Sequence, residues 1–402
     1  MATPKLWQSA EGEIHPLVEA YTIGEDYRLD QQLLPYDIMA SKAHAGMLHQ
    51  MEVLTLEEWK SVMKGLDDIL EQWAKGNFQI ALEQEDGHTA IEQYLSTHYG
   101  EIGKKIHTGR SRNDQSLVML RLYAREQHQA VEAALEKVVG CFRETAHKHG
   151  QTPMPGYTHL QAAMPTTVGA WLGAYQDGFF DARSMLSCMD VILQQNPLGS
   201  ASGFGIDSFP MDRNYTTEML GFARTQENPL YCGLSRGWME ASFLNSLAPA
   251  MQMAGRFAQD MLLFTTREFG FFSLPEHFTT GSSIMPQKRN YDLFEVMRGQ
   301  VRVFLGYQQQ LSGIVAGLNS GYQRDLQLTK KPFLQGVELA RHTFFLLAEV
   351  ITALQVNTGR LDAAMDAELF VTDQVYRKVQ EGVPFREAYQ AVKHQWTNQA
   401  RT

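Results

Sequence analysis

The sequence has few cysteines, no long uncharged apolar run, no low-complexity segment and no internal repeat. Its three cysteines, Cys141, Cys188 and Cys232, are widely spaced, which argues against a disulfide framework and against a structural zinc cluster. No segment is long and apolar enough to be predicted as a membrane span. A formal net charge of -10 argues against a general nucleic-acid surface, although a local cationic pocket for a small dianion remains compatible with it.

The length and composition of the chain are those of a soluble globular protein. Its 402 residues, of which 44% are hydrophobic, suffice for a large core or several domains. The amino-terminal stretch, residues 1–7, has no charged start followed by an apolar segment and a cleavage site. We therefore predict no secretion and a cytoplasmic location.

Five long, apolar-rich runs predict long helices, at residues 116–149, 166–193, 233–269, 289–313 and 333–356. The first has no proline, and as a helix it would be roughly 50 Å long. Pro249 is predicted to kink the third run. Little strand patterning accompanies them, so we predict an all-α, or mainly α, fold with an elongated central five-helix bundle. The apolar residues are too many for one helix face, which predicts burial against other subunits.

These patterns divide the chain into three predicted domains. An N-terminal, mostly helical domain covers residues 1–108, a central bundle and oligomerisation domain covers 109–356, and a short C-terminal helical domain covers 357–402. In the first domain, Thr55 and Glu58 have the spacing of a capping box. A further helix is predicted to begin within residues 84–92, after an acidic turn.

Residues 104–115 form a dense polar stretch immediately before the first long helix. Lysines, arginines, hydroxyls and amides surround one glycine there, and Arg110 and Arg112 stand where a helix presents free N–H groups. This arrangement suits a carboxylate or phosphate, whereas the alternative is a solvated basic turn.

A second polar stretch, residues 279–290, is predicted to be a loop that opens a helix. Gly281 permits unusual backbone angles, Ser282 offers a hydroxyl, Pro286 stiffens the exit and Lys288 supplies a cation. Such a loop could close over a bound anion. The alternative is an ordinary helix-entry loop with a serine cap.

Other polar strings remain ambiguous when each is considered alone. Residues 153–161 predict a rigid turn that presents Thr158 and His159, and the glycine-rich residues 196–205 predict close backbone packing rather than dinucleotide binding. Residues 319–332 have the composition of a solvated loop. No cluster has metal-ligand spacing, so we predict no metal.

Four of these strings together resemble the argininosuccinate lyase family of the fumarase/aspartase superfamily. They are His107–Gln115, Met154–Gln161, Gly281–Asn290 and Tyr322–Lys330, and the similarity is collinear from about residue 5 to 390. The Arg-Ser-Arg-Asn-Asp-Gln string and the Met-Pro-Gln-Lys form of the loop favour this family over fumarase, aspartase and adenylosuccinate lyase. The resemblance implies a central bundle of long helices and a homotetramer whose active sites are shared between subunits.

The resemblance implies the reversible cleavage of argininosuccinate to arginine and fumarate, without a cofactor. It implies Ser282 as the base, His159 as the acid at the departing nitrogen and Glu295 as the carboxylate that orients the histidine. The residues implied in substrate binding are Ser41, His88, Arg110, Ser111, Arg112, Asn113, Thr158, Lys288, Asn290, Tyr322, Gln327 and Lys330. Among them, Ser111, Asn113, Lys288 and Asn290 are suited to stabilise the aci-carboxylate that forms when the proton leaves.

Three features depart from the family pattern. Arg289-Asn290-Tyr291 stands in place of Lys-Asn-Pro, and Leu234–Trp238 stands in place of Ser-Asp-Arg-Asp-Phe. The chain also stops soon after residues 384–389, so we expect a reduced third domain. Two alternatives remain open, another fumarate-releasing lyase acting on adenylosuccinate or aspartate, and a catalytically retired structural homologue.

Overall fold

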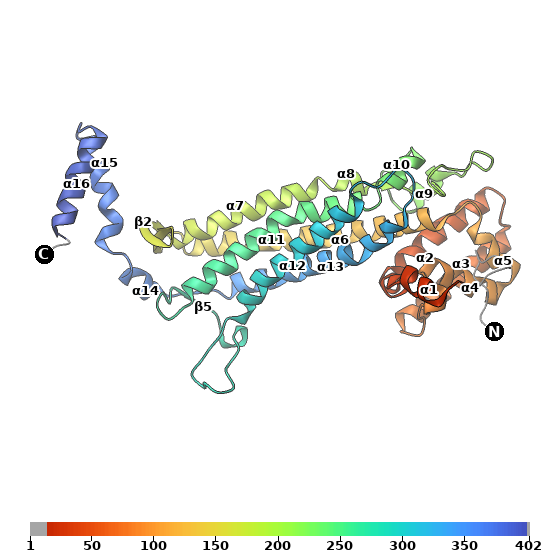
Figure 1. Ribbon diagram of the computed structural model, residues 1–402, viewed down its shortest axis with the longest axis horizontal. Helices are drawn as coiled ribbons and strands as arrows, with labels where there is room; N and C mark the ends of the chain where they lie inside the picture. The colour runs from red at the N-terminus through yellow and green to blue at the C-terminus, as the bar shows by residue number, and fades with distance from the viewer. Residues whose placement is uncertain (1–13, 400–402) are drawn as a thin grey trace. The chain divides into compact units, whose positions relative to one another are not determined.

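The computed structural model describes residues 14–399, which form a mainly α-helical fold (Figure 1). This confirms the fold class expected from the long apolar-rich runs. Within the described range, no helix combines the length and the apolar character needed to cross a membrane. The prediction about a secretion signal concerns residues that lie outside this range.

The chain divides into two compact units. The first unit comprises residues up to 129, 188–245 and 307–337, and the second unit comprises 130–187, 246–306 and 338 onward. Four long helices contribute residues to both units. The division of the chain into three domains stays a prediction.

The five expected runs are confirmed as helices, with different ends. They are α6 (Arg112–Lys148), α7 (Val168–Ser187), α11 (Trp238–Phe264), α12 (Asp292–Val315) and α13 (Lys330–Thr352). The run expected at 166–193 is divided, because α7 ends at Ser187 and a separate short helix, α8, spans Asp190–Leu193. Pro249 lies inside α11, and the kink expected there stays a prediction.

The remaining elements of the first unit are helices of different lengths and one small parallel strand pair. They are α1 (Pro16–Ile23), α2 (Asp26–Gln50), α3 (Leu56–Ala74), α4 (Gly87–Tyr99), α5 (Glu101–Lys104), α9 (Arg213–Met219), α10 (Pro229–Leu234), 3-10 helices at Leu82–Gln84, Lys105–His107 and Arg324–Thr329, and strands β3 (Gln195–Asn196) and β4 (Arg224–Thr225). The predicted capping box is confirmed, since Thr55 N donates to Glu58 at 2.9 Å and Glu58 N donates to Thr55 Oγ1 at 3.3 Å. The helix expected after the acidic turn is α4, whose start is capped by Asp86.

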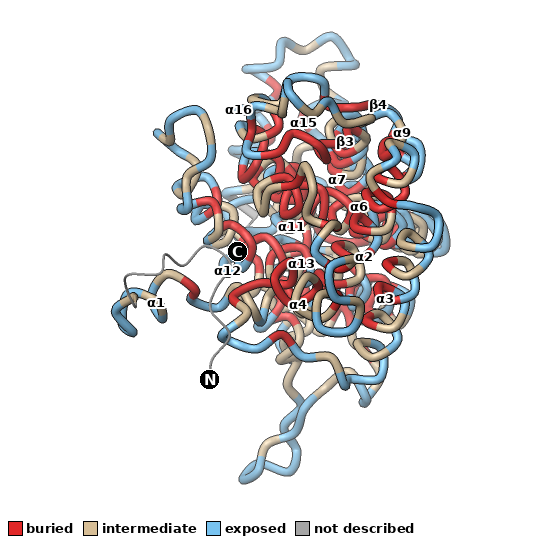
Figure 2. Tube along the Cα trace, turned by 90° about the vertical axis from the view of Figure 1, so that its right-hand side faces the viewer, coloured by how far each residue is buried: buried red, intermediate tan, exposed pale blue. Residues whose placement is uncertain are grey.

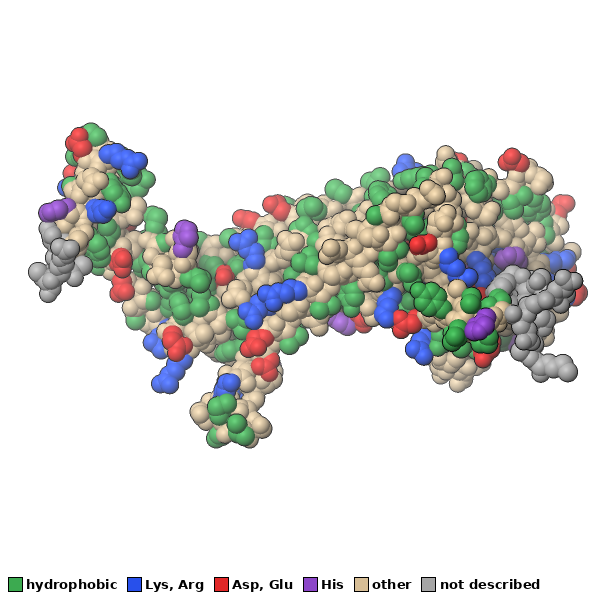
Figure 3. Space-filling view, in the orientation of Figure 1, with side chains coloured by type: hydrophobic (Ala, Val, Ile, Leu, Met, Phe, Trp, Pro, Cys, Tyr) green, Lys and Arg blue, Asp and Glu red, His purple; other side chains and the backbone are tan. Residues whose placement is uncertain are grey.

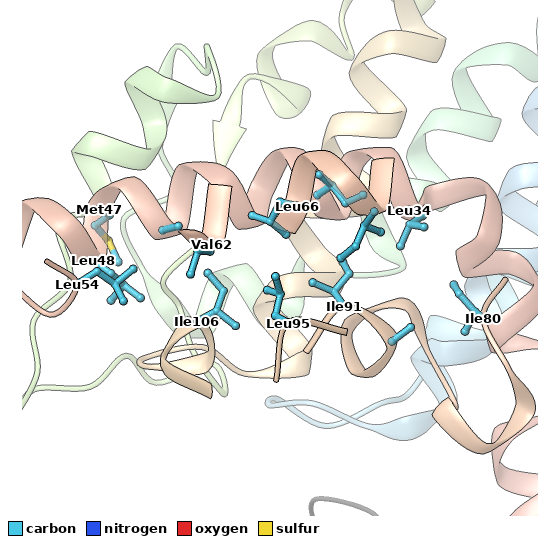
Figure 4. Close-up of a cluster of buried hydrophobic side chains, with 14 residues drawn as sticks. Leu34, Met47, Leu48, Leu54, Val62, Leu66, Ile80, Ile91, Leu95 and Ile106 are labelled. Atoms are coloured by element: carbon cyan, nitrogen blue, oxygen red, sulfur yellow. The ribbon is translucent and has the colours of Figure 1, made fainter. Parts of the chain in front are cut away.

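An apolar core joins α2, α3 and α4 in the first unit. Leu34 comes from α2, Val62 and Leu66 from α3, and Ile91 and Leu95 from α4, and all five side chains are buried (Figure 4). In Figure 2 the buried residues lie mainly on helices, while helices and loops both carry exposed residues. Burial of this apolar surface is the main term that holds the three helices together.

Aromatic side chains connect the long helices within the second unit. Phe142 of α6 stacks on Phe179 of α7 with ring centroids 5.4 Å apart, and its edge contact with Phe257 of α11 spans 5.3 Å. Phe257 in turn contacts Phe294 of α12 at 6.3 Å. Lys137 of α6 pairs with Glu349 of α13 at 2.7 Å. All five long helices therefore contribute to one bundle in this unit.

A β-hairpin stands where the sequence predicted only a rigid turn. Strands β1 (Pro153–Thr158) and β2 (Gln161–Thr167) pair antiparallel, and the two residues between them, His159 and Leu160, have φ of 54° and 59°. The prolines in both strands hide the pattern that would have predicted them.

Outside the bundle, the second unit also contains short strands and helices. Some precede the loop at residues 279–290, and the others follow α13. They are strands β5 (Phe272–Ser273) and β6 (Gln355–Val356), 3-10 helices at Glu276–Phe278 and Ala367–Phe370, and helices α14 (Thr358–Ala363), α15 (Val371–Gln380) and α16 (Phe385–Gln399). Val375, Ala388 and Val392 form a small buried cluster between α15 and α16.

We expect Leu66→Ala to destabilise the protein strongly. Leu66 is 0% exposed in α3, and replacing a buried leucine with alanine costs about 2–5 kcal/mol, because it leaves a cavity. Leu56→Ala is the matched control, since Leu56 begins the same helix and is 47% exposed, and its effect should stay within about 0.5 kcal/mol. Urea unfolding at one protein concentration measures both, and equal effects would contradict this assignment of the core.

Candidate active site

The start of α6 is held in place by contacts from the body of the first unit. Gly109 has a φ of 75°, which turns the chain into the helix. The buried Arg110 donates from Nη1 to Ser41 Oγ of α2 at 2.9 Å. The structure thus brings together two of the residues that the resemblance implied in substrate binding.

Asp114 fixes the backbone on which Ser111 and Asn113 lie. Its Oδ1 accepts from Ser111 N at 2.8 Å, and its Oδ2 accepts from Gly199 N at 3.0 Å and Ala201 N at 3.1 Å. Burial raises the pKa of Asp114 to about 6, although these hydrogen bonds and Arg110 oppose the rise. The glycine-rich connection therefore packs closely against the predicted site.

Arg112 is surrounded by acceptors from the beginning of α4 and the turn before it. Its Nη2 donates to Thr89 Oγ1 at 2.6 Å, its Nη1 lies 3.2 Å from Glu85 Oε2, and its Nε lies 3.4 Å from Asp86 Oδ2. The sequence predicted the cation but not its acidic partners. These contacts hold the guanidinium in one orientation.

His88 lies between an acid and a hydroxyl in the interior of the first unit. Its Nδ1 is 2.6 Å from Asp37 Oδ2, and its Nε2 is 3.1 Å from Ser116 Oγ. Burial by itself lowers the pKa of His88, but Asp37, Asp86 and Asp30 outweigh burial and raise it. The imidazole is thereby stabilised in its protonated form.

Lys330 is only 1% exposed and forms ion pairs with two carboxylates of α2. Its Nζ lies 2.6 Å from Asp30 Oδ1 and 3.0 Å from Asp26 Oδ2. Burial lowers the pKa of Lys330, but the two carboxylates reverse this and raise it, so the ammonium stays charged. Asp30 also accepts from Gly87 N at 3.1 Å, which links this pair to α4.

A small cavity lies among these groups. It has a volume of about 160 Å³, and both cations and carboxylates line it. The lining residues are Ile23, Asp26, Glu85, Asp86, Arg112, Asn113, Ser116, Arg236, Tyr322, Arg324 and Gln327. Gln327 donates to the carbonyls of Thr22 at 3.1 Å and Ile23 at 3.0 Å. The structure thus gathers predicted residues from distant strings around one polar cavity.

The carboxylates of α2 were not predicted as site residues, although the sequence contains a signal for them. Asp26, Asp30, Asp37 and Ser41 follow one another at separations that place them on one side of a helix. A stripe of acids on a helix whose other residues are largely apolar indicates buried partners of positive charge. Arg236 and Arg324 were missed as well, and no spacing in the sequence predicts that they line the cavity.

The other predicted residues lie on two exposed features of the second unit. Thr158 and His159 are exposed at the end of the β1–β2 hairpin. Ser282 and Lys288 lie in a loop whose ends pair through Thr280 and Asn290, with N···O distances of 3.0 and 2.9 Å. The loop projects away from β5 and α12 (Figure 1), with hydrophobic and cationic side chains near its tip (Figure 3).

The loop conformation directs backbone N–H groups toward the hydroxyl of Ser282. Its Oγ accepts from Met285 N at 3.1 Å and from Ile284 N at 3.4 Å. Both donors favour negative charge on this oxygen. The predicted loop that opens a helix is confirmed, since α12 begins at Asp292 directly after it.

Within one chain, the predicted site residues of the second unit do not form a common site. Glu295 is exposed in the first turn of α12. Among residues 14–399, no hydrogen bond or ion pair joins Ser282, Lys288 or Glu295 to the hairpin turn. In the same range, no group of three or more His, Cys, Asp and Glu side chains has a geometry that could hold a metal ion.

Comparison with known proteins gives consistent matches over nearly the whole chain. A family model described as "Lyase" matches residues 11–306. An argininosuccinate lyase of Sorangium cellulosum is 41% identical over 391 residues, covering 96% of this chain and 90% of the relative. An argininosuccinate lyase of Thermotoga neapolitana is 36% identical over 392 residues, covering 98% of both chains.

Solved structures match the fold over the same extent. EDDS lyase in complex with formate superposes with a TM-score of 0.81 at 25% identity, covering 98% of this chain and 78% of that one. A class II fumarase from Schistosoma mansoni superposes with a TM-score of 0.80 at 16% identity, covering 98% and 92%. At that identity the fumarase match shows the fold alone.

We expect Asp114→Asn to change how stability depends on pH. The pKa of Asp114 is raised from 3.8 to about 6 on folding, so the folded chain binds more protons than the unfolded chain between these values. The free energy of unfolding should therefore fall as the pH rises through this window, by about 1 kcal/mol per pH unit from this residue. Urea unfolding across the window should show this component lost in the variant, and parallel pH profiles would contradict the assignment.

Proposed function

Because the chain belongs to the argininosuccinate lyase family of the fumarase/aspartase superfamily, we propose that it cleaves argininosuccinate reversibly into L-arginine and fumarate, as a carbon–nitrogen lyase of arginine biosynthesis. The observation that carries this proposal is the similarity over nearly the full chain to proteins that bear this name. Acid, base and electrostatic stabilisation suffice for the elimination, so the proposal includes no cofactor and no metal.

In the proposed mechanism Ser282 is the base. It takes a proton from the carbon next to a carboxylate of the succinyl half, which leaves a dianionic aci-carboxylate. A serine hydroxyl acts as a base only in an anionic form, and the N–H groups of Ile284 and Met285 already point at its oxygen, at 3.4 and 3.1 Å. Lys288 is the nearest cation of the loop in sequence and would add to this stabilisation.

The aci-carboxylate needs fixed donors, which we assign to Ser111, Asn113, Lys288 and Asn290. When it collapses, its electron pair forms the double bond of fumarate and the bond to the guanidinium nitrogen breaks. His159 is the proposed acid that protonates this nitrogen, because an imidazole titrates near neutral pH. Glu295 is proposed to hold the imidazole ring in the required orientation.

The first unit supplies the proposed binding surface for the rest of the substrate. Its charged groups are held by protein partners, as the contacts of the half-buried Arg112 and the buried Lys330 illustrate. We assign Ser41, His88, Arg110, Arg112, Tyr322, Gln327 and Lys330 to it, together with Thr158 of the hairpin turn. Groups that are fixed in advance cost little reorganisation when the substrate binds.

We further propose a homotetramer whose active sites are shared between subunits. The exposure of the segments that would do the chemistry supports this. Ser282 is half-buried, but most of its loop is exposed, Ile284 by 83%, and the hairpin turn with His159 is exposed as well. Partner subunits would cover these residues and exclude water from the site. The proposal includes a cytoplasmic location and three domains, at residues 1–108, 109–356 and 357–402. It includes no nucleic-acid partner and no membrane partner.

Ser282→Ala should abolish most of the fumarate release from argininosuccinate. Loss of a general base lowers kcat by about 100- to 10,000-fold. Ser283→Ala is the matched control, since it removes the neighbouring hydroxyl of the same exposed loop and should keep most of the activity. Fumarate formation is followed for the purified protein and both variants.

The same assay with adenylosuccinate, aspartate and malate separates the alternatives. Turnover of one of these in place of argininosuccinate would indicate a different fumarate-releasing lyase. A folded protein that forms no product from any of the four substrates would indicate a retired structural homologue. Equal losses in the two serine variants would argue against Ser282 as the base.

Mixed subunits should recover activity if the active sites are shared. Arg112→Ala and Ser282→Ala affect different units of the chain, so a hybrid assembly can contain a site with both native residues. We expect fumarate release to rise when the two inactive variants are unfolded and refolded together. Ser282→Ala mixed with Lys288→Ala is the control, because both changes lie in one loop, and recovery there or none in the first mixture would contradict shared sites.

A further inference from the structure

The loop at residues 279–290 leaves the second unit between two packed segments (Figure 1). On the entry side, Phe272 of β5 is buried and stacks on Trp171 of α7, with ring centroids 4.8 Å apart. On the exit side, Phe294 of α12 is buried and contacts Phe257 of α11. Apolar packing fixes both segments, so the orientation of the loop depends on the few residues that lie between them.

Little else connects the loop to the rest of the chain. All residues from 281 to 289 except Ser282 are exposed. Within the described range, Ser282 Oγ and Lys288 N form their hydrogen bonds inside the loop, and the ion pair of Arg289 is the one polar contact that leaves it. A loop that is held only at its base keeps one orientation only if the base is rigid.

Polar contacts hold the base of the loop closed. We call this base the neck, and it comprises residues 274–280 on the entry side and 289–292 on the exit side. In addition to the backbone pair described above, Arg289 Nη1 lies 2.5 Å from Glu276 Oε1, and Thr280 Oγ1 donates to Asp292 Oδ2. Arg289 and Glu276 are both exposed, so their ion pair by itself contributes little.

Tyr291 provides the neck contact that reaches a buried residue. Its Oη accepts a hydrogen bond from Leu274 N at 3.4 Å, and Leu274 is 5% exposed. Among residues 14–399, no other acceptor binds this N–H group, and a buried N–H group without an acceptor costs free energy. The ring of Tyr291 lies 6.2 Å from that of Phe294. Tyr291 therefore links the packed exit segment to the packed entry segment.

We propose that Tyr291 is a positioning residue, because its hydroxyl and its ring fix the neck and thereby the orientation in which the loop presents Ser282 and Lys288. The inference rests on the proposed function for the role of Ser282. The pair of Arg289 and Glu276 closes the same neck as a second, weaker contact. Such positioning matters for the rate, since displacing a reacting group by about 1 Å can slow a reaction about 100-fold.

Hydrogen exchange at the amides of Thr280 and Asn290 reports on the neck without requiring catalysis. These two N–H groups form the backbone pair of the neck, so their exchange requires the pair to open. Tyr291→Phe keeps the ring and removes the hydroxyl. We expect it to speed the exchange of both amides by about 2- to 10-fold, the effect of one hydrogen bond. Unchanged exchange would overturn the proposed role of Tyr291.

Tyr291→Phe should also lower kcat/KM for fumarate release by about 2- to 10-fold, with little change in the thermal unfolding midpoint. Tyr175→Phe is the matched control, because Tyr175 Oη donates to Asp260 Oδ2 at 2.7 Å between α7 and α11 of the same unit. The control should lower the midpoint and leave both the neck exchange and kcat/KM unchanged. Equal losses of kcat/KM in the two variants would indicate a general loss of stability and overturn the positioning role.

A double-mutant cycle tests the weaker contact of the neck. Glu276→Gln and Arg289→Gln should each speed the exchange of the neck amides by at most about fivefold, because the pair is exposed. If Arg289 acts on the loop through Glu276, the double variant should exchange no faster than the faster of the two single variants. Effects that add would show that the two side chains act separately, and would overturn this second contact.

Fumarate release from argininosuccinate, measured on the same preparations, separates this inference from the proposed function. Release with faster neck exchange but an unchanged kcat/KM in Tyr291→Phe would overturn the positioning role and leave the reaction in place. Faster neck exchange in Tyr291→Phe, in a protein that releases no fumarate before substitution, would support the role of Tyr291 in holding the loop and overturn the reaction.

Discussion

The ammonium group of Lys330 lies in the interior of the first unit, where Asp26 and Asp30 of α2 balance its charge at 3.0 and 2.6 Å. Asp30 also accepts from the backbone of Gly87, so the same carboxylate determines where α4 begins. From α4, His88 reaches Asp37 of α2 and Ser116 of α6. These contacts together connect α2, α4, α6 and α13. Removing the cation of Lys330 would leave the two carboxylates, of which Asp30 is buried, without compensation.

Such a network contributes little to the stability of the fold, because burying paired charges stabilises a protein little more than apolar packing of the same volume does. The leucines and isoleucines between α2, α3 and α4 hold those helices together without the free-energy cost of removing charges from water (Figure 4). The polar interior is better explained by the function that we propose. Donors and acceptors that are already fixed around a cavity need not reorganise when a charged substrate arrives.

The second unit differs from the first in how its proposed site residues are held. His159 is exposed on a hairpin turn, and the half-buried Ser282 lies in an otherwise exposed loop whose ends pair through the backbone of Thr280 and Asn290. The turn is held by the positive φ of His159 and Leu160, and the loop by N–H groups directed at Ser282. Local backbone geometry therefore prepares these groups, while their proposed surroundings come from other subunits.

The sequence by itself determined the helices and the residue types of the candidate site. Helical periodicity and the capping box of Thr55 are local, and the strings around Arg112 and Ser282 are contiguous, so neighbouring residues suffice to predict them. The hairpin was not predicted, because the prolines in both of its strands obscure the residue pattern that is typical of a strand. Only the tertiary structure decided that Lys330 pairs with an aspartate 300 residues earlier and that acids surround Arg112. These features depend on which distant segments approach one another, and the charge or periodicity of a single segment does not encode that approach.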